Sequence, residues 1–252
     1  MEKLIAVMGS PGSGKSTVSL AIASYFSSKK ENTIILSADK TVPMMPVYEP
    51  TNTTIDTKYS LGRLLADGDI TEETVLDKIC FHNNSDNLGL MALTNEDNMT
   101  TYPHYFNREK INSLLGVLYR VADYVIVDCT SDFVNDSLTL TALEKADVII
   151  RLLTADSKGI VYWSSQKGLL QDDKFIVGKT YINAISNYKQ CCPVEETKHA
   201  IGEVLGEIKY FFPYSYDIED KMISGKLIKG LSRREGIQFE NNIKKLAEME
   251  VI

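Results

Sequence analysis

The fold of this chain is decided by the stretch Gly9-Ser10-Pro11-Gly12-Ser13-Gly14-Lys15-Ser16. It matches the pattern G-x-x-x-x-G-K-[ST] in full, follows the apolar run 4–8 and precedes a segment of helical periodicity. Backbone N–H groups of such a loop wrap a phosphate, and glycines are needed because side chains would obstruct the wrap. The following helix presents its positive end to the same phosphates. The pattern predicts a nucleotide site formed by Gly9, Gly12, Ser13, Gly14, Lys15, Ser16 and Thr17.

Lys15, Ser16 and two strand-end carboxylates are the candidate catalytic and metal-binding residues. Lys15 is expected between the β- and γ-phosphates, and the Ser16 hydroxyl is expected to coordinate Mg²⁺. Asp128 follows four apolar residues, as the aspartate of a Walker B strand does, and is expected to hold Mg²⁺ through water. Asp39 follows the run 34–38 and is a candidate for orienting the attacking water if its strand neighbours the phosphate-loop strand. The alternative for either aspartate is an ordinary turn residue.

Short apolar runs alternate with segments of helical periodicity along the whole chain. Continuous apolar runs suit strands covered on both faces, and the alternation predicts an α/β P-loop NTPase fold with a mostly parallel central sheet and helices on both faces. The expected strands are 4–8, 33–36, 88–93, 124–129, 148–153, 180–185 and 208–212. The expected helices are 15–29, 71–80, 108–121, 135–145, 157–170, 195–205 and 233–249. Thr71 and Ser232, each followed by acidic residues, are expected N-caps.

The chain shows no repeat and no Gly/Ser-rich or Pro-rich linker, which predicts one domain over residues 1–252. The loosest stretch is 41–57, which contains Pro43, Pro46 and Pro50, and it is expected to be a mobile loop within that domain. Segment 94–105 is a second loose stretch, just before the helix expected at 108–121.

The 252 residues are 44% hydrophobic and 24% charged, which excludes a collagenous or low-complexity chain. The net charge of −7 opposes wholesale binding to DNA or anionic lipid. No apolar run approaches the roughly 18 residues of a membrane span, and the run before Gly9 is too short for a signal peptide. The four cysteines form no C-x-x-C pair. A cytoplasmic protein with reduced thiols is expected.

The order of these motifs resembles the ParA/MinD family of P-loop ATPases, in the SIMIBI class, over essentially the full chain. Segment 37–39 resembles the family's element after the second strand. Segments 122–128, 140–147 and 152–156 resemble its Walker B strand, the next helix and the next strand. Segments 59–65, 70–73 and 87–93 look like the CpaE/TadZ-like pilus-localisation branch. In this resemblance Asn183 would contact adenine, and Pro213 and Tyr214 would flank the base.

The resemblance implies ATP and Mg²⁺ as cofactors, and a nucleotide switch that positions or regulates a partner assembly in partitioning, division or pilus-like systems. It also implies an ATP-dependent homodimer and a protein partner that the sequence does not identify. One departure concerns hydrolysis: Ser10 stands where dimer-forming members usually carry a signature lysine. Losing a cation aimed at the partner's phosphates removes transition-state stabilisation, so hydrolysis is expected to be weak or absent. Cys129-Thr130 replaces a frequent proline-containing sequence, and the role of Asp132 is open.

Two alternatives stand beside the ATPase. One is a nucleotide-binding scaffold of the same fold with little or no hydrolysis. The other is a small-molecule kinase, disfavoured because 41–109 holds only two arginines, Arg63 and Arg108, where a phosphoryl-transfer lid usually needs several cations. Membrane binding is disfavoured because the apolar stripe of 233–249 is typical of a core. DNA binding is disfavoured because acidic residues surround the basic residues that could form a local patch, Lys226, Lys229, Arg233 and Arg234.

Overall fold

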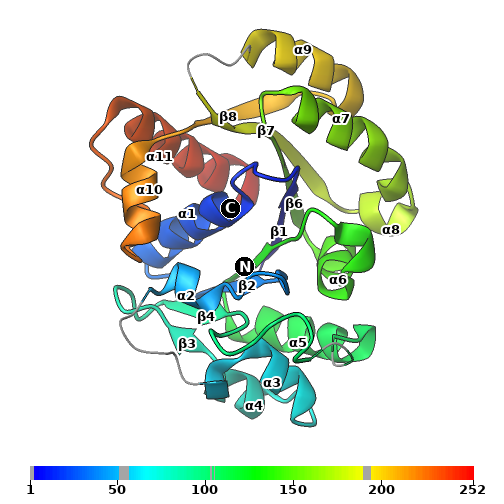
Figure 1. Ribbon diagram of the computed structural model, residues 1–252, viewed down its shortest axis with the longest axis vertical. Coiled ribbons are helices and arrows are strands. Elements are labelled where there is room, and N and C mark those ends of the chain that lie inside the picture. The colour runs from blue at the N-terminus through cyan, green and yellow to red at the C-terminus, as the bar shows by residue number, and fades with distance from the viewer. Residues whose placement is uncertain (1–2, 51–56, 103, 105, 190–193) are drawn as a thin grey trace.

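The computed structural model describes residues 3–50, 57–102, 104, 106–189 and 194–252. Its centre is an eight-stranded sheet (Figure 1). The strands are β1 (Lys3–Gly9), β2 (Thr33–Ser37), β3 (Cys80–Phe81), β4 (Leu88–Met91), β5 (Tyr124–Asp128), β6 (Val148–Leu153), β7 (Thr180–Tyr188) and β8 (Ile208–Pro213). They lie in the order β3-β4-β2-β5-β1-β6-β7-β8. Every neighbouring pair is parallel except β3 with β4. The α/β P-loop NTPase fold expected from the sequence is confirmed.

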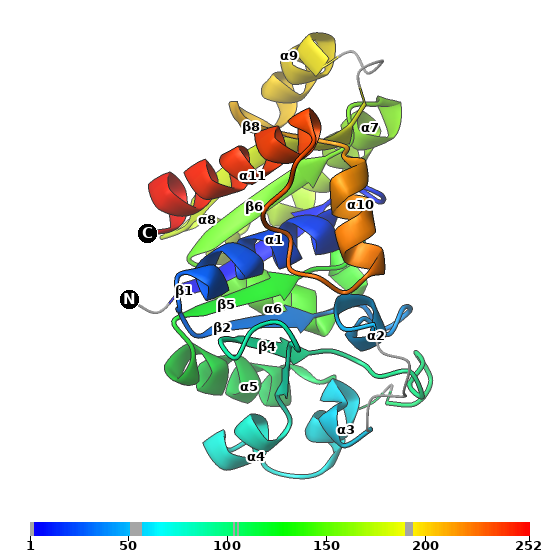
Figure 2. The same cartoon turned by 90° about the vertical axis from the view of Figure 1, so that its left-hand side faces the viewer.

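Helices cover both faces of the sheet (Figures 1 and 2). They are α1 (Lys15–Ser28), α2 (Met45–Tyr48), α3 (Leu61–Ala66), α4 (Glu72–Asp77), α5 (Arg108–Val121), α6 (Ser137–Lys145), α7 (Ser157–Gln166), α8 (Asp173–Ile176), α9 (Val194–Leu205), α10 (Tyr216–Ile223) and α11 (Arg234–Leu246). Short 3-10 turns lie at Thr57–Tyr59, Phe133–Asn135 and Lys167–Leu170, and a π-helical turn at Ala247–Val251. Among the described residues, no helix has the length and apolar character needed to cross a bilayer.

Two separate apolar clusters form the core, one on each face of the sheet. One joins the sheet to α1, α2, α10 and α11, and the other joins it to α3–α9. The strands supply both clusters because their side chains alternate between the faces; all five residues of β2 and of β5 are buried. The apolar runs in the sequence are continuous because helices cover both faces of the sheet, as expected.

The apolar stripe near the chain's end belongs to this core. Phe239, Ile243, Leu246 and Ala247 are at most 3% exposed and pack with the cluster that contains α1. This packing uses the face that a membrane-bound helix would turn to lipid. The stripe is therefore a core feature, as its spacing predicted.

The central strands place the site. β1 pairs with β5 on one side and with β6 on the other, while α1 and α6 pack on opposite faces of the sheet. In open parallel sheets, ligands bind at the carboxyl ends of the strands where the connections diverge in this way. The loops after β1, β2 and β5 meet at that edge.

The sequence missed one strand and several short helices. β3 and the helices α2, α3, α8 and α10 were not expected, and α2 lies in the stretch 41–57 that was expected to be a mobile loop. Residues 51–56 of that stretch lie outside the described residues. The Thr71 cap is confirmed, because its side chain accepts a hydrogen bond from Thr74 N–H. The Ser232 cap is wrong: the Asp217 carboxylate binds the N–H groups of Ser232 and Arg233 at 2.8 and 2.6 Å.

Gly159, in the first turn of α7, is required by close packing. A Cβ at this position would collide with the carbonyl oxygen of Thr154 and lie 2.9 Å from its Oγ1. We expect Gly159→Ala to lower the free energy of unfolding by about 1–3 kcal/mol, since this backbone contact cannot relax locally. Gly202→Ala in α9, where a Cβ meets nothing within 4 Å, is the matched control. It should raise the free energy of unfolding by up to about 1 kcal/mol in urea titrations; equal effects of the two variants would contradict this packing.

Candidate nucleotide-binding site

The turn from β1 into α1 has the backbone geometry of a phosphate-binding loop. Gly12 and Gly14 have φ values of 75° and 74°, in the left-handed region that glycine adopts without strain. No side chain caps the start of α1, and its first turn contains no acidic residue. The N–H groups at this helix end are therefore available to an anion, which the helix dipole also favours.

The loop residues divide into those that line a cleft and those that lie beneath it. A cleft of about 590 Å³ opens above the loop, and Gly12, Gly14, Lys15, Ser16 and Thr17 line it. Gly9 lies below, where a Cβ would collide with the carbonyl oxygen of Leu152. The Ser13 hydroxyl is fully buried without a hydrogen-bond partner. Gly9 and Ser13 thus shape the loop from inside.

Lys15 lies along the floor of this cleft. Its Nζ donates to the carbonyl oxygen of Ser10 (3.4 Å) and to the Ser131 hydroxyl (2.6 Å), which itself donates to the carbonyl oxygen of Gly9 (2.9 Å). Burial lowers the pKa of Lys15, and the neighbouring Asp128 carboxylate opposes that shift. Neutral oxygen acceptors hold the ammonium at the cleft. A charged phosphate oxygen would accept a stronger hydrogen bond from it than they do.

Asp128 ends β5 and is only 3% exposed. It stands in register with Val7 of β1 and Ser37 of β2. Its Oδ2 accepts a hydrogen bond from the Tyr48 hydroxyl at 2.6 Å, whereas its Oδ1 has no partner. The Oδ1 of Asp128 is therefore a buried acceptor that has neither a hydrogen-bond donor nor a cation as its partner.

The groups around Asp128 fit a Mg²⁺ ion. The Ser16 hydroxyl and the Asp128 carboxylate are oxygen ligands, which Mg²⁺ prefers, and the unpartnered Oδ1 needs such a partner. Within the described ranges, no group of three or more His, Cys, Asp or Glu side chains is arranged to hold a metal by itself. A Mg²⁺ ion here would take its remaining ligands from phosphate and water, as it commonly does.

Asp39 and Asp132 line the same cleft. β5 lies between β1 and β2, so the strand adjacency on which the Asp39 hypothesis depended is absent. The Asp39 Oδ1 accepts from the N–H groups of Thr41 (2.8 Å) and Val42 (3.0 Å), as a turn aspartate does. Asp132 accepts from the Asn135 amide at 3.0 and 3.1 Å. Asp39 thus shapes its loop and borders the cleft, and its water-orienting role stays a prediction.

A second cleft of about 250 Å³ adjoins the first across Gly14 and Thr17, which line both. Pro213 and Tyr214, the residues expected to flank a base, lie in its wall. Asn187, the last residue but one of β7, also lines this cleft, and its amide donates to the carbonyl oxygen of Gly12 at 3.1 Å. This cleft is continuous with the phosphate loop and is large enough for a flat ring system.

Asn183, for which an adenine contact was expected, does not line either of these clefts. Asn183 lies in the middle of β7 and is 5% exposed. Its Oδ1 accepts from Arg151 (2.7 Å), and its Nδ2 donates to the carbonyl oxygens of Leu205 and Glu207, each at 3.0 Å. The strand continues to Tyr188, so the asparagine at the nucleotide edge is Asn187. The apolar run 180–185 hid this extension, because Ser186 and Asn187 are polar.

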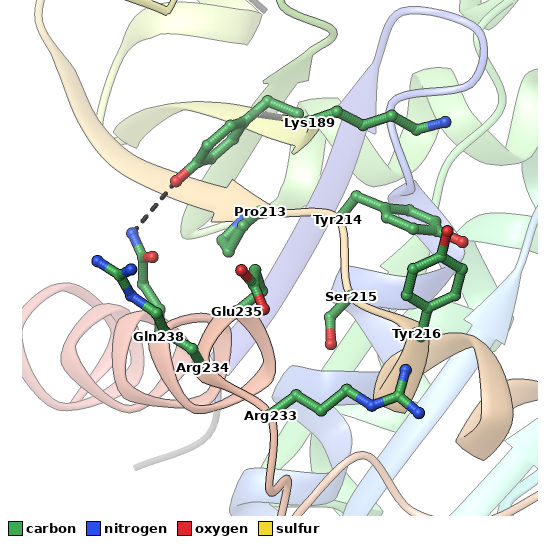
Figure 3. A pocket seen from close by; sticks show the side chains of 10 residues that line it. Lys189, Pro213, Tyr214, Ser215, Tyr216, Arg233, Arg234, Glu235 and Gln238 are labelled. Carbon is green, nitrogen blue, oxygen red and sulfur yellow. Dashed lines mark hydrogen bonds between the residues drawn. The ribbon is translucent and has the colours of Figure 1, made fainter. Parts of the chain in front are cut away.

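A third cleft, of about 600 Å³, adjoins the second, and Pro213 and Tyr214 line both (Figure 3). The Lys189 ammonium lies 5.1 Å from the Tyr214 ring. Arg233 forms an ion pair with Asp217 at 3.0 Å, and the Glu235 carboxylate lies among the basic side chains. Acidic groups thus accompany the cations here, in agreement with the mixed surface expected from the sequence.

Ser10 replaces the signature lysine in a setting that leaves no room for a long side chain. It is fully buried, and its hydroxyl accepts a hydrogen bond from Thr154 N–H at 3.3 Å. The side chain at this position therefore fastens the phosphate loop to the end of β6. It does not extend towards a second molecule.

Comparisons with known proteins cover the chain unevenly. The family model of Zeta toxin matches residues 2–67, about a quarter of the chain. That segment includes the phosphate loop and Asp39 but not β5. A search of curated proteins finds no match.

Solved structures match nearly the full chain at low identity. The ATP complex of an McdA variant from Cyanothece is 16% identical, with a TM-score of 0.72 over 100% of this chain and 98% of that one. MinD from Pyrococcus horikoshii, complexed with Mg-ADP, is 13% identical, with a TM-score of 0.72 over 98% and 97%. A ParA family ATPase from Chlorobium tepidum is 15% identical, with a TM-score of 0.72 over 98% of each chain.

The architecture and the phosphate loop define an α/β P-loop NTPase fold. Within that class, the chain has the fold of the ParA, MinD and McdA ATPases. The resemblance to the CpaE/TadZ-like branch stays a prediction.

Lys15→Ala tests the phosphate-binding role of the loop. We expect the variant to lose about 2–5 kcal/mol of nucleotide-binding free energy, because a charge-assisted contact to phosphate is removed. Lys174→Ala, which removes a surface lysine paired with Glu144, should leave binding intact. Calorimetric titration with Mg·ATP measures both, and unchanged affinity in Lys15→Ala would contradict the assignment.

Asn183 and Asn187 form a second test pair. Asn183→Ala should lower the melting temperature, because it removes the hydrogen bonds to Arg151 Nε and to the carbonyl oxygens of Leu205 and Glu207, but should bind nucleotide like wild type once folded. Asn187→Ala should keep most of its stability and lose nucleotide affinity. Thermal unfolding and titration of a fluorescent ATP analogue distinguish the two, and the reverse pattern would restore Asn183 to the site.

Proposed function

We propose that this chain is a Mg²⁺-dependent, ATP-binding P-loop ATPase of the ParA/MinD type, a nucleotide switch that positions or regulates a partner assembly. The observation that carries the proposal is the junction of two clefts. The phosphate cleft contains Lys15, Ser16 and Asp128, and it continues across Gly14 and Thr17 into the cleft that contains Pro213 and Tyr214. A nucleoside triphosphate fits this arrangement, with its phosphates in the first cleft and its base in the second.

The residues of the cleft suit phosphoryl chemistry. Lys15 and the uncapped start of α1 bind the phosphates, and Ser16 and Asp128 hold Mg²⁺. The ion, when bound, neutralises charge on the phosphates. Asp39 orients the attacking water, with its carboxylate fixed at the cleft by the N–H groups of its own loop. Two of the similar structures are described as an ATP complex and an Mg-ADP complex, which supports ATP and Mg²⁺ as the ligands.

The buried Ser10 supports weak hydrolysis. A partner's triphosphate would receive no cation from this position, and such a cation is worth orders of magnitude in rate in other P-loop enzymes. The scaffold with little or no turnover is therefore the second candidate, and the same observation favours it.

The kinase alternative gains no support from the two arginines of segment 41–109. Arg63 is paired with Asp67, and Arg108 is paired with Glu144 on α6. Neither arginine lines the phosphate cleft. A phosphorylated small product in a metabolite screen would nevertheless revive this alternative.

Apolar side chains beside the cleft support a protein contact. Val42 lines the cleft and is 47% exposed, and Val134, in the 3-10 turn after Asp132, is 46% exposed. Both belong to the loops that meet the phosphates, so a surface here would respond to the nucleotide. We propose an ATP-dependent homodimer or a protein partner at this edge, in the cytoplasm; the mixed surface charge and the buried stripe of α11 disfavour DNA and membrane binding.

Single-turnover hydrolysis tests the proposal. Wild-type protein with Mg·ATP should hydrolyse on the order of 10⁻³ s⁻¹ or more slowly, as P-loop enzymes do without an added catalytic cation. Asp39→Asn should lower the rate about 10²-fold or more without changing Mg·ATP affinity, because it removes the group that orients water. Chromatographic quantification of ADP measures the rate. An ATP complex that stays intact with and without candidate partners would exclude the ATPase and leave the scaffold.

A further inference from the structure

Tyr48 places a buried phenol beside the predicted metal ligand. It belongs to the four-residue helix α2, in the stretch that the sequence suggested to be a mobile loop. Its side chain is 0% exposed, and its hydroxyl donates to Asp128 Oδ2 at 2.6 Å. The two residues are 80 positions apart in the chain, so tertiary packing alone brings them together.

The packing of α2 holds this phenol in place. Met45 is fully buried, and its N–H donates to the carbonyl oxygen of Leu93 at 3.1 Å. After the helix, Glu49 is 5% exposed and accepts hydrogen bonds from the backbone and side chain of Asn83, at 2.9 and 2.6 Å. Anchors on both sides of Tyr48 therefore limit its movement.

Two serines complete the cluster around the phenol. Ser37 ends β2 in register with Asp128, and its hydroxyl lies near the Tyr48 phenol and opposes the burial-driven rise in the phenol's pKa. The hydroxyl of Ser16, the predicted metal-binding residue, lies near both side chains and opposes the burial-driven rise in the pKa of Tyr48 and of Asp128. The phenol therefore donates to one of the two groups of this chain that would hold Mg²⁺ and lies near the other.

The two oxygens of Asp128 differ in the way that a metal-bound carboxylate requires. Oδ2 is occupied by the Tyr48 hydroxyl, whereas Oδ1 is buried and has no partner. A carboxylate with one oxygen fixed by a protein donor can rotate little, and its other oxygen keeps one direction. In metal sites, donors of this kind orient the ligand, and removing one typically costs 10–100-fold in metal affinity.

We propose that Tyr48 is a positioning residue for Mg²⁺, which holds the Asp128 carboxylate so that Oδ1 faces the ion or its water. The role rests on the proposed function, because it presupposes that the protein binds a Mg·nucleotide. It assigns the helix α2 to the metal site. A plain packing role for Tyr48 predicts a different result, since packing does not depend on the metal.

The test is a Mg²⁺ titration of ADP affinity in the Tyr48→Phe variant. Binding of a fluorescent ADP analogue is measured at a series of free Mg²⁺ concentrations and in EDTA. We expect the Mg²⁺ midpoint to rise about 10–100-fold, while affinity in EDTA stays at the wild-type value. A hydrolysis assay is not needed, so the result does not depend on turnover.

Tyr210→Phe is the matched control. Tyr210 is 7% exposed and donates to the Glu250 carboxylate at 3.3 Å, on β8 and outside the phosphate cleft. Its variant removes a partly buried phenol–carboxylate contact away from the site and should leave the Mg²⁺ midpoint unchanged. If Tyr48→Phe fails to fold, Ser37→Ala loosens the same phenol, and a smaller shift in the same direction is expected.

The outcomes separate the inference from the function. A wild-type midpoint in Tyr48→Phe, or equal loss of affinity with and without Mg²⁺, would overturn the positioning role and leave the nucleotide site standing. Tighter Mg²⁺ binding in Tyr48→Phe would also overturn it, because the phenol would then compete with the ion. Wild-type protein that binds no ADP, or binds it without regard to Mg²⁺, would overturn the proposed function and the inference together.

Discussion

The parallel pairing of β5 between β1 and β2 is the constraint on which the site depends. It puts Asp128 level with Val7, two residues before the phosphate loop, and with Ser37 at the end of β2. A parallel sheet brings the carboxyl ends of its strands to one edge, so three loops from distant parts of the chain meet there. Lys15, Asp128 and Asp39 are neighbours for this reason. Their burial is a consequence of the same arrangement, because helices cover both faces of these strands.

The electrostatics of the edge follow from that burial. Lys15 loses solvation and keeps neutral acceptors, while Asp128 is buried with one oxygen unpartnered. A charged ligand that brings phosphate oxygens and a cation would satisfy both groups. The net charge of −7 is consistent with a local site of this kind, since the positive potential comes from one lysine and a loop of N–H groups in an acidic molecule. Ser10, fully buried, adds no charge to it.

Much of this could be predicted from the sequence where a signal was long or chemically specific. All seven expected strands are present, because parallel strands buried on both faces have continuous apolar sequences. Asp128 was found because it ends such a run. β3 was missed because two residues at an edge form no run. Asn187 was missed because its strand continues through polar residues, and Tyr48 because prolines mark its surroundings as a loop. The cluster Met44, Met45, Val47 and Tyr48 was the available signal, since a solvated loop seldom concentrates such side chains.

Hydrogen–deuterium exchange with and without Mg·ATP tests the central claim most directly. A single experiment measures protection in all of the loops that the pairing of β5 brings together. Bound nucleotide should slow exchange in residues 9–17, in the loops after β2 and β5, and around 186–187 and 213–215, while the edge strand β3 and its neighbour β4 exchange as before. Protection confined to other regions, or none at all at saturating Mg·ATP, would contradict a nucleotide site at this edge of the sheet.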